Sequence, residues 1–317
     1  MPWHVGIDEA GYGPNLGPFV MTLVACHMPD DRCLWETMKS HVRRFDDPAD
    51  HRMIVADSKQ VYSTAQGWDQ LERTALSAHH GGFFEDADSL VDLLDNLAFD
   101  GLAALRQEAW FVGDTVLPTE VPAPDLSAGV DGWRAASKSC GLKWGFCQSA
   151  IVPAPRFNDL IDRWDSKAAV LSVAITDLMQ RCLENTDTEP MRFVVDKHGG
   201  RNTYSALLQH VFADGIVWAE EEGRMRSVYR VEGLDRDVRI TFMPKADVGH
   251  FTVALASMIS KYVRELLMRE FNRFWQTHVP GLAPTAGYPN DAGRYFDAIR
   301  PAMVKLGIDE RAVWRCR

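Results

Sequence analysis

Three apolar runs of this 317-residue chain each end in carboxylates, and this pattern limits what the chain can fold into. The first run, "VGIDE", ends in Asp8 and Glu9 and is followed at once by the glycine- and proline-rich stretch 11–18. The others are "RFVVD", which ends at Asp196, and "VRITFMPKAD", which ends at Asp247. Such runs indicate strands that leave a sheet into loops, with an acid at the point of exit.

The order of strand-like and helix-like segments predicts a mixed α/β sheet with helices packed on it. Strand patterns lie at 3–8, 19–28, 142–152, 191–196 and 227–247, the first two as a hairpin and the last as a hairpin with Gly233 in its turn. Helical spacing is found at 33–45, from near Ser63 to 79, at 168–183, 203–212 and 251–275, with a further helix near the C-terminus.

The stretch 83–139 is the least regular part of the chain. Leucines at 89–99 have helical spacing, but residues 117–132 are rich in proline, glycine and aspartate. We expect an irregular excursion that packs on the rim of the domain and contributes no strand to the central sheet.

Composition is that of an ordinary globular protein, with 46% hydrophobic and 25% charged residues. The N-terminal residues read directly as a strand, so we expect no signal peptide, and no apolar run is long enough to span a bilayer. The net charge of −10 argues mildly against nonspecific coating of nucleic acid, but it is compatible with a nuclease whose carboxylates hold metal ions. The cysteines form no C-x-x-C pair, which favours reduced thiols and a cytoplasmic location: Cys26, Cys33, Cys140, Cys147, Cys182 and Cys316.

The opening stretch allows more than one interpretation. Asp8 shares a strand face with Gly6, and a carboxylate in that position is costly to bury unless a positive group meets it. A solvated turn after an acidic strand end is one alternative. A dinucleotide-binding loop is another, although the acids would face a pyrophosphate and Pro14 stands where a helix should offer N–H groups.

The acids at Asp196 and Asp247 favour a shared carboxylate cluster over either alternative. Each acid alone is more often a helix cap or a turn residue. Together with Asp8 and Glu9 they form an oxygen-rich ligand set without histidine or cysteine at ligand spacing, which suits two Mg²⁺ or Mn²⁺ ions. Such a cluster commonly serves phosphoryl transfer.

At this point the sequence resembles the type 2 ribonuclease H family, which comprises ribonuclease HII and the archaeal and eukaryotic ribonuclease H2 catalytic subunits. The resemblance rests on five stretches in the family's order: "GIDEAGYGPNLGPFV", "VADSK", "FVVDKHGG", "KADVGHFTVALASMISKYVRELLM" and "GYPND". Together they frame nearly the whole chain apart from 83–139. The resemblance implies a ribonuclease H-like catalytic domain at 1–278, with 83–139 as an insertion, and a C-terminal helical extension at 279–317.

The resemblance also implies the roles of particular residues. Asp8, Glu9, Asp196 and Asp247 would be the catalytic residues and would hold two Mg²⁺ or Mn²⁺ ions. The substrate, an RNA/DNA hybrid or duplex DNA with embedded ribonucleotides, would be cut to leave 5′-phosphate and 3′-hydroxyl ends. The residues implied to contact it are Gly11, Tyr12, Gly13, Ser58, Lys59 and Tyr288.

Tyr12 departs from the family, which has arginine between the two glycines. The backbone contacts of the loop to the ribonucleotide would survive, but the arginine's charge would not. We therefore expect weaker binding of single embedded ribonucleotides, with continuous hybrids less affected because many phosphate contacts share the load. A nuclease with a different nucleic-acid substrate, or a non-catalytic nucleic-acid-binding relative, remains an alternative.

Overall fold

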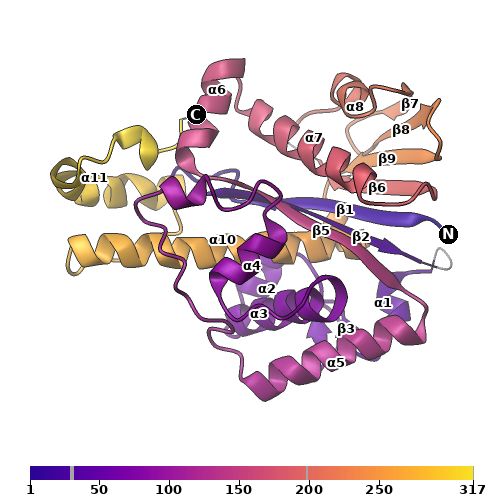
Figure 1. Cartoon of the computed structure of the whole chain (residues 1–317), viewed down its shortest axis with the longest axis horizontal. Helices are drawn as coiled ribbons and strands as arrows, with labels where there is room; N and C mark the ends of the chain where they lie inside the picture. The colour runs from indigo at the N-terminus through magenta and orange to yellow at the C-terminus, as the bar shows by residue number, and fades with distance from the viewer. Residues whose placement is uncertain (29–31, 198, 317) are drawn as a thin grey trace.

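A seven-stranded mixed sheet forms the centre of the protein in the computed structural model, which describes residues 1–28, 32–197 and 199–316 (Figure 1). The strand order is β5-β2-β1-β6-β9-β8-β7. Strand β1 pairs in parallel with β6, and β6 with β9, whereas the other neighbours are antiparallel. The strands are β1 (Trp3–Ala10), β2 (Phe19–His27), β5 (Lys143–Val152), β6 (Met191–Asp196), β7 (Ile216–Glu222), β8 (Ser227–Glu232) and β9 (Val238–Met243).

Helices cover both faces of this sheet, and a short parallel pair, β3 (Val42–Arg43) and β4 (Met53–Ile54), lies beside it. The α-helices in the described residues are α1 (Leu34–Thr37), α2 (Ser58–Tyr62), α3 (Gly67–Ala78), α4 (Leu90–Leu97), α5 (Ala123–Ser139), α6 (Ala154–Trp164), α7 (Ala168–Glu184), α8 (Ser205–Val211), α9 (Ala246–Gly249), α10 (Phe251–His278) and α11 (Pro289–Leu306). Short turns of other helix types lie at His79–Phe83, Leu105–Gln107 and Glu310–Ala312.

Alternating side chains of β2 show how the sheet is buried on both faces. Val20 and Val24 belong to the hydrophobic cluster that contains α3, α4, α5 and α10, whereas Met21 and Leu23 belong to the cluster of α6, α7 and α8. Figure 1 shows α6–α8 on one side of the sheet and α10 with α2–α5 on the other. The mixed sheet with flanking helices agrees with the predicted fold class.

Helix α10 crosses β1 so closely that only glycine fits at position 6. A Cβ atom built on Gly6 would lie 2.2 Å from the carbonyl carbon of Thr252 and 2.3 Å from the nitrogen of Val253. Because Asp8 lies on the same strand face as Gly6, this contact directs Asp8 toward α10. The close approach therefore places the first acid against a helix that supplies polar partners.

Several predicted elements are present where the sequence placed them. Strands β1 and β2 form the expected hairpin, and β8 and β9 form the second one, with Gly233 in the turn at φ +88°. The strands at 142–152 and 191–196 and the long helix at 251–275 are also confirmed, as β5, β6 and α10.

Two local predictions were wrong. The helix expected over 33–45 is limited to Leu34–Thr37, because Val42 and Arg43 instead pair with Met53 and Ile54 in a parallel ladder. The proline-rich stretch expected to be irregular contains α5, a 17-residue helix. Proline in its first turn costs no hydrogen bond there, so proline content did not exclude a helix.

The stretch 83–139 contributes no strand to the sheet, as expected, but it is not confined to the rim. The leucines of α4 are at most 1% exposed, and Trp133 of α5 is fully buried in the cluster that also contains α10. The C-terminal region contains the expected helix, α11, whose Tyr295 stacks on Phe271 of α10 with ring centroids 5.9 Å apart. The division into a catalytic domain and an extension stays a prediction. Within the described parts of the chain, no helix is long and apolar enough to cross a membrane.

Candidate active site

The parallel order β1-β6-β9 brings the predicted acids to one edge of the sheet. Asp8 lies near the carboxyl end of β1, Asp196 is the last residue of β6, and Asp247 lies in α9 just after β9. The carboxyl ends of neighbouring parallel strands meet at the same edge. A cavity of about 250 Å³ opens there, lined by Asp8, Glu9, Asp57, Lys59, Gln60, Asp196, Lys245, Asp247, Val248 and Ser257.

Asp8 is the most buried acid of this cavity, with 8% of its surface exposed. Its Oδ1 accepts a hydrogen bond from the backbone N–H of Glu9 at 2.8 Å, and its carbonyl accepts one from the Ser260 hydroxyl at 3.0 Å. Burial raises the pKa of Asp8 well above its ordinary value, and the charges of Glu9 and Asp196 raise it further, while a hydrogen bond with Ser257 opposes them. The cavity thus concentrates negative charge in a poorly hydrated place.

Asp247 lies in the same electrostatic environment. Burial raises its pKa to about 6, with the charges of Asp57 and Asp196 adding to the effect and Lys59 opposing it. Asp196 accepts the backbone N–H of Ala246 at 2.9 Å, which ties the start of α9 to the end of β6. The acids from β6 and α9 are therefore held in a fixed relation by the backbone.

Asp57 is a fifth acid that the sequence analysis did not select. It begins α2 by accepting the backbone N–H of Lys59 at 2.8 Å, and its side chain lines the cavity. Its place directly before Ser58 and Lys59 in "VADSK" was the available signal, but an N-cap role would produce the same sequence. Lys245 was missed as well; it has a left-handed backbone, with φ +55°, at the turn into α9.

Ser58 and Lys59 differ in where they point. Lys59 lines the cavity. The Ser58 side chain is buried, with its hydroxyl 3.0 Å from the hydroxyl of Ser257 on α10, and it does not line the cavity. The structure thus places one of these two residues at the cavity and the other behind it.

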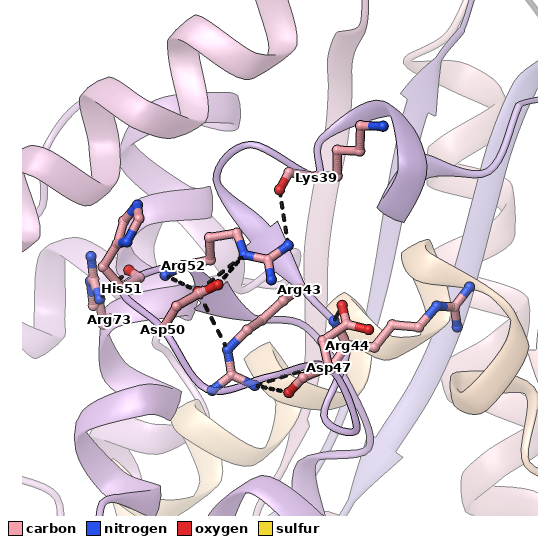
Figure 2. A network of polar contacts seen from close by, with 8 residues as sticks. All are labelled: Lys39, Arg43, Arg44, Asp47, Asp50, His51, Arg52 and Arg73. Carbon is pink, nitrogen blue, oxygen red and sulfur yellow. Dashed lines mark hydrogen bonds and ion pairs between the residues drawn. The ribbon is translucent and has the colours of Figure 1, made fainter.

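An arginine network supports α9 from the β3–β4 side. Figure 2 shows Asp50 bound by Arg52, whose Nε lies 2.8 Å from Oδ2, and Arg43 donating to the carbonyl of Asp47. Arg44 in the same network donates to the carbonyl of Val248 at 3.1 Å. Because Val248 follows Asp247, the β3–β4 region helps to fix the fourth acid.

The glycine-rich loop 11–17 lies against the predicted C-terminal motif. The backbone N–H groups of Asn15 and Leu16 donate to the carbonyl of Gly287 at 2.8 and 3.2 Å. A Cβ atom on Gly13 would lie 3.8 Å from the Tyr288 ring, and Tyr288 is 39% exposed. The structure thus brings together residues that are more than 270 positions apart in the sequence.

Tyr12 connects this loop to the acid cavity. Burial and the charge of Glu9 raise the pKa of its hydroxyl, which means that the two side chains are near each other. The Tyr12 ring packs edge-on against Phe19 at 6.2 Å, and the Lys167 ammonium lies 4.8 Å from its centroid. Positive charge therefore reaches this loop from other parts of the chain, although position 12 is tyrosine.

The donor set of the cavity fits a hard divalent cation in composition, because carboxylate oxygens dominate it. Burial, and then the charges of neighbouring acids, raise the pKa of Asp8 and Asp247. The positions of the side chains are looser than a formed ligand cluster. In residues 1–28, 32–197 and 199–316, no three acidic, histidine or cysteine side chains are arranged to hold a metal ion together.

Comparison with known proteins gives similarity to solved structures alone. No family model and no curated protein matches the chain. It aligns over 99% of its length, and 94% of the other chain, with a structure of the PCNA:RNase HII complex from Archaeoglobus fulgidus, at 15% identity and a TM-score of 0.42. Alignment with ribonuclease H2 from Pyrococcus horikoshii OT3 covers 98% and 92% of the two chains, at 14% identity and a TM-score of 0.43. A mutant form of Bst-RNase HIII aligns over 98% of this chain and 65% of its own, at 14% identity and a TM-score of 0.49.

Proposed function

We propose that this chain is a divalent-metal-dependent endonuclease that hydrolyses RNA in RNA/DNA hybrids or at ribonucleotides embedded in duplex DNA, leaving 5′-phosphate and 3′-hydroxyl ends. The observation that carries the proposal is the convergence of acids from β1, β6 and α9 on one cavity beside Lys59. Elements far apart in the sequence supply these side chains, and their charges destabilise one another. A purely structural role would not need such an arrangement.

Asp8, Glu9, Asp196 and Asp247 would hold two Mg²⁺ or Mn²⁺ ions in this proposal. The ions would supply activation of a water and stabilisation of the leaving 3′ oxygen. Asp57 adjoins this group and adds negative charge beside Asp247. The protein's own contribution is to hold the acids on strand ends and a helix that are fixed by hydrogen bonds.

The groups proposed to contact substrate lie around the cavity. Lys59 would meet a phosphate near the acids, and the backbone of Gly11, Tyr12 and Gly13 would approach the ribonucleotide with Tyr288 beside it. Gly11 has φ +86°, a conformation that glycine adopts without strain. Ser58 would act through Ser257, because its hydroxyl is buried.

A non-catalytic nucleic-acid-binding role is less well supported, because a cluster of carboxylates repels phosphate unless cations bridge the two. A nuclease acting on a different nucleic-acid structure would use the same acids. The two nuclease assignments differ only in the substrate that is cut.

The deciding experiment compares three labelled substrates: a continuous RNA/DNA hybrid, a DNA duplex with one ribonucleotide, and an all-DNA duplex. We expect cleavage of the first two, loss of cleavage with chelator, and recovery on addition of Mg²⁺ or Mn²⁺. Cleavage of the all-DNA duplex at an equal rate would refute the substrate assignment. If neither Mg²⁺ nor Mn²⁺ supports cleavage of any of the three substrates, the proposal of nuclease activity is refuted.

Asp8→Asn tests the proposed site itself. We expect it to abolish cleavage and to raise the thermal midpoint at pH 8, because it removes a charge that is made unfavourable by burial and then by repulsion from Glu9 and Asp196. Asp297→Asn is the matched control, since Asp297 is exposed and 3.4 Å from Arg300 on α11. A fully active Asp8→Asn variant would contradict the proposal.

A further inference from the structure

Two arginines are buried beneath the glycine-rich loop, outside the acid cavity. Arg264 of α10 is 0% exposed, and Arg315 is 1% exposed. Arg264 donates to the carbonyl of Ala286 at 2.9 Å and to the carboxylate of Glu265 at 3.2 Å. Arg315 donates from Nη2 to the carbonyl of Pro14, in the middle of the loop. Arg264 also lies against Gly11, where a built Cβ atom would be 2.3 Å from its Nε, so both arginines support the loop from its inner side.

The segment that carries Arg315 is paired with the loop along its backbone. The Arg315 N–H donates to the carbonyl of Asn15 at 2.8 Å, and Leu16 forms an antiparallel bridge with Trp314. The side chain of Asn158 on α6 binds the other side of the segment, donating to the Trp314 carbonyl at 2.9 Å and accepting the Cys316 N–H at 2.7 Å. The loop and residues 314–316 thus form one unit.

The charge on Arg315 has no counter-charge in the part of the chain that the structure describes. No salt bridge joins it to a described carboxylate, and its Nε and Nη1 atoms are buried without hydrogen-bond partners. The Nε atom of Arg264 is in the same situation. Burial and the charge of Arg264 lower the pKa of Arg315 to about 9. The guanidinium lies 4.4 Å from the centroid of the Phe157 ring and donates to one carbonyl, but no described carboxylate neutralises it. A buried charge held in this way is costly, which suggests a functional role for it.

The groups around Arg315 indicate what kind of ligand would compensate its charge. Tyr12 and Tyr288, both of the loop region, lie near enough to Arg315 to influence its pKa. A phosphate approaching the acid cavity meets repulsion, and a cation behind the glycine-rich loop would offset that repulsion. Gly13 leaves room on the loop for such an approach, because a Cβ built there would meet only the Tyr288 ring, at 3.8 Å.

We propose that Arg315 is a positioning residue that fixes the glycine-rich loop and supplies the positive charge that draws a substrate phosphate to that loop. This inference rests on the proposed function, since it names a phosphate of the nucleic-acid substrate as the counter-charge. Arg315 acts through the loop backbone and does not touch the reacting atoms.

Arg315→Met, Arg315→Gln and Arg315→Lys test this role. Methionine fills similar space without charge, glutamine keeps one N–H donor for the Pro14 carbonyl, and lysine keeps the charge. Arg300→Met is the matched control, because it removes an arginine that is exposed and paired with Glu310 at 3.1 Å. Binding of a labelled RNA/DNA hybrid is measured by anisotropy over a series of salt concentrations, alongside kcat, KM and the thermal midpoint.

We expect Arg315→Met and Arg315→Gln to weaken binding and raise KM by about tenfold, with kcat within about twofold and a salt slope shallower by about one. The thermal midpoint should change little in Arg315→Met, because removal of a buried charge offsets the loss of the hydrogen bond to the Pro14 carbonyl. Arg315→Lys should recover most of the affinity, and Arg300→Met should resemble the parent.

Parent-like binding and salt slope in both neutral variants would overturn the inference. So would an Arg315→Lys variant as weak as Arg315→Met, since charge would then not matter. If the parent protein binds the hybrid without cutting it, the nuclease proposal is refuted. The binding data for the Arg315 variants then still test the proposed role of Arg315. A parent that binds neither duplex would refute both.

Discussion

Glu72 offers the sharpest test of how the stretch 83–139 is held to the rest of the protein. This residue of α3 is 0% exposed, and its two carboxyl oxygens accept five hydrogen bonds. The donors are the backbone N–H groups of residues 119–121 and the hydroxyls of Thr119 and Tyr262, at distances from 2.7 to 3.0 Å. One side chain therefore joins α3, α10 and the end of the irregular stretch.

Glu72→Gln replaces one of these oxygens with an amide NH₂, which cannot accept. In the less costly orientation the NH₂ faces the backbone N–H groups of Glu120 and Val121, since both donate to the same oxygen. Each buried donor left without an acceptor costs about 1–3 kcal/mol, so we expect the unfolding free energy to fall by about 2–6 kcal/mol. The substitution changes the volume very little, so a lost contact or a cavity would not explain such a fall.

Urea unfolding followed by tryptophan fluorescence gives this difference directly. Glu120→Gln is the control, because Glu120 is exposed and paired only with Arg269 at 2.8 Å, and a surface pair contributes at most about 1 kcal/mol. A loss below about 1 kcal/mol in Glu72→Gln would contradict this prediction, since it would mean that the N–H groups of Glu120 and Val121 find other acceptors.

Further predictions concern packing and pH. Gly6→Ala should destabilise the fold by about 3 kcal/mol or more, because its Cβ atom would overlap the α10 backbone. Gly293→Ala, on the open side of α11, should instead stabilise the fold by about 0.5–1 kcal/mol, and thermal unfolding of the two variants measures both effects. Burial raises the pKa of Glu108 to about 7 from an ordinary value of 4.5, so the folded state holds this proton after the unfolded state has lost it and stability falls as pH rises between those values. Glu108→Gln should therefore gain up to about 3 kcal/mol over the parent at pH 8 and nothing at pH 4.5; equal gains at both values would contradict the assignment. Burial lowers the pKa of His79 to about 3, so its neutral form contributes stability that is present above about pH 6.5 and is lost as the pH falls toward 3. His79→Asn should therefore lose less stability than the parent when unfolding is measured from about pH 6.5 down to about pH 3.

Local sequence patterns predicted the elements in which local spacing and long-range environment agree. The two hairpins, the strand ending at Asp196 and the long helix α10 were readable because period-2 or period-3.6 apolar spacing coincides with burial. Acids at strand ends predicted a cluster, because parallel strands deliver their carboxyl ends to one edge.

Other features depend on contacts between distant segments, so they appear only in the tertiary structure. Val42 became a strand through its partner Met53, and Asp57 joined the cavity because α2 lies beside α9. Nothing local to Arg315 indicates that it meets Pro14 some 300 residues earlier, or that it is buried without a counter-charge among the described residues. Local sequence determines which residues face the interior. The packing of the layers determines which charged groups meet in that interior.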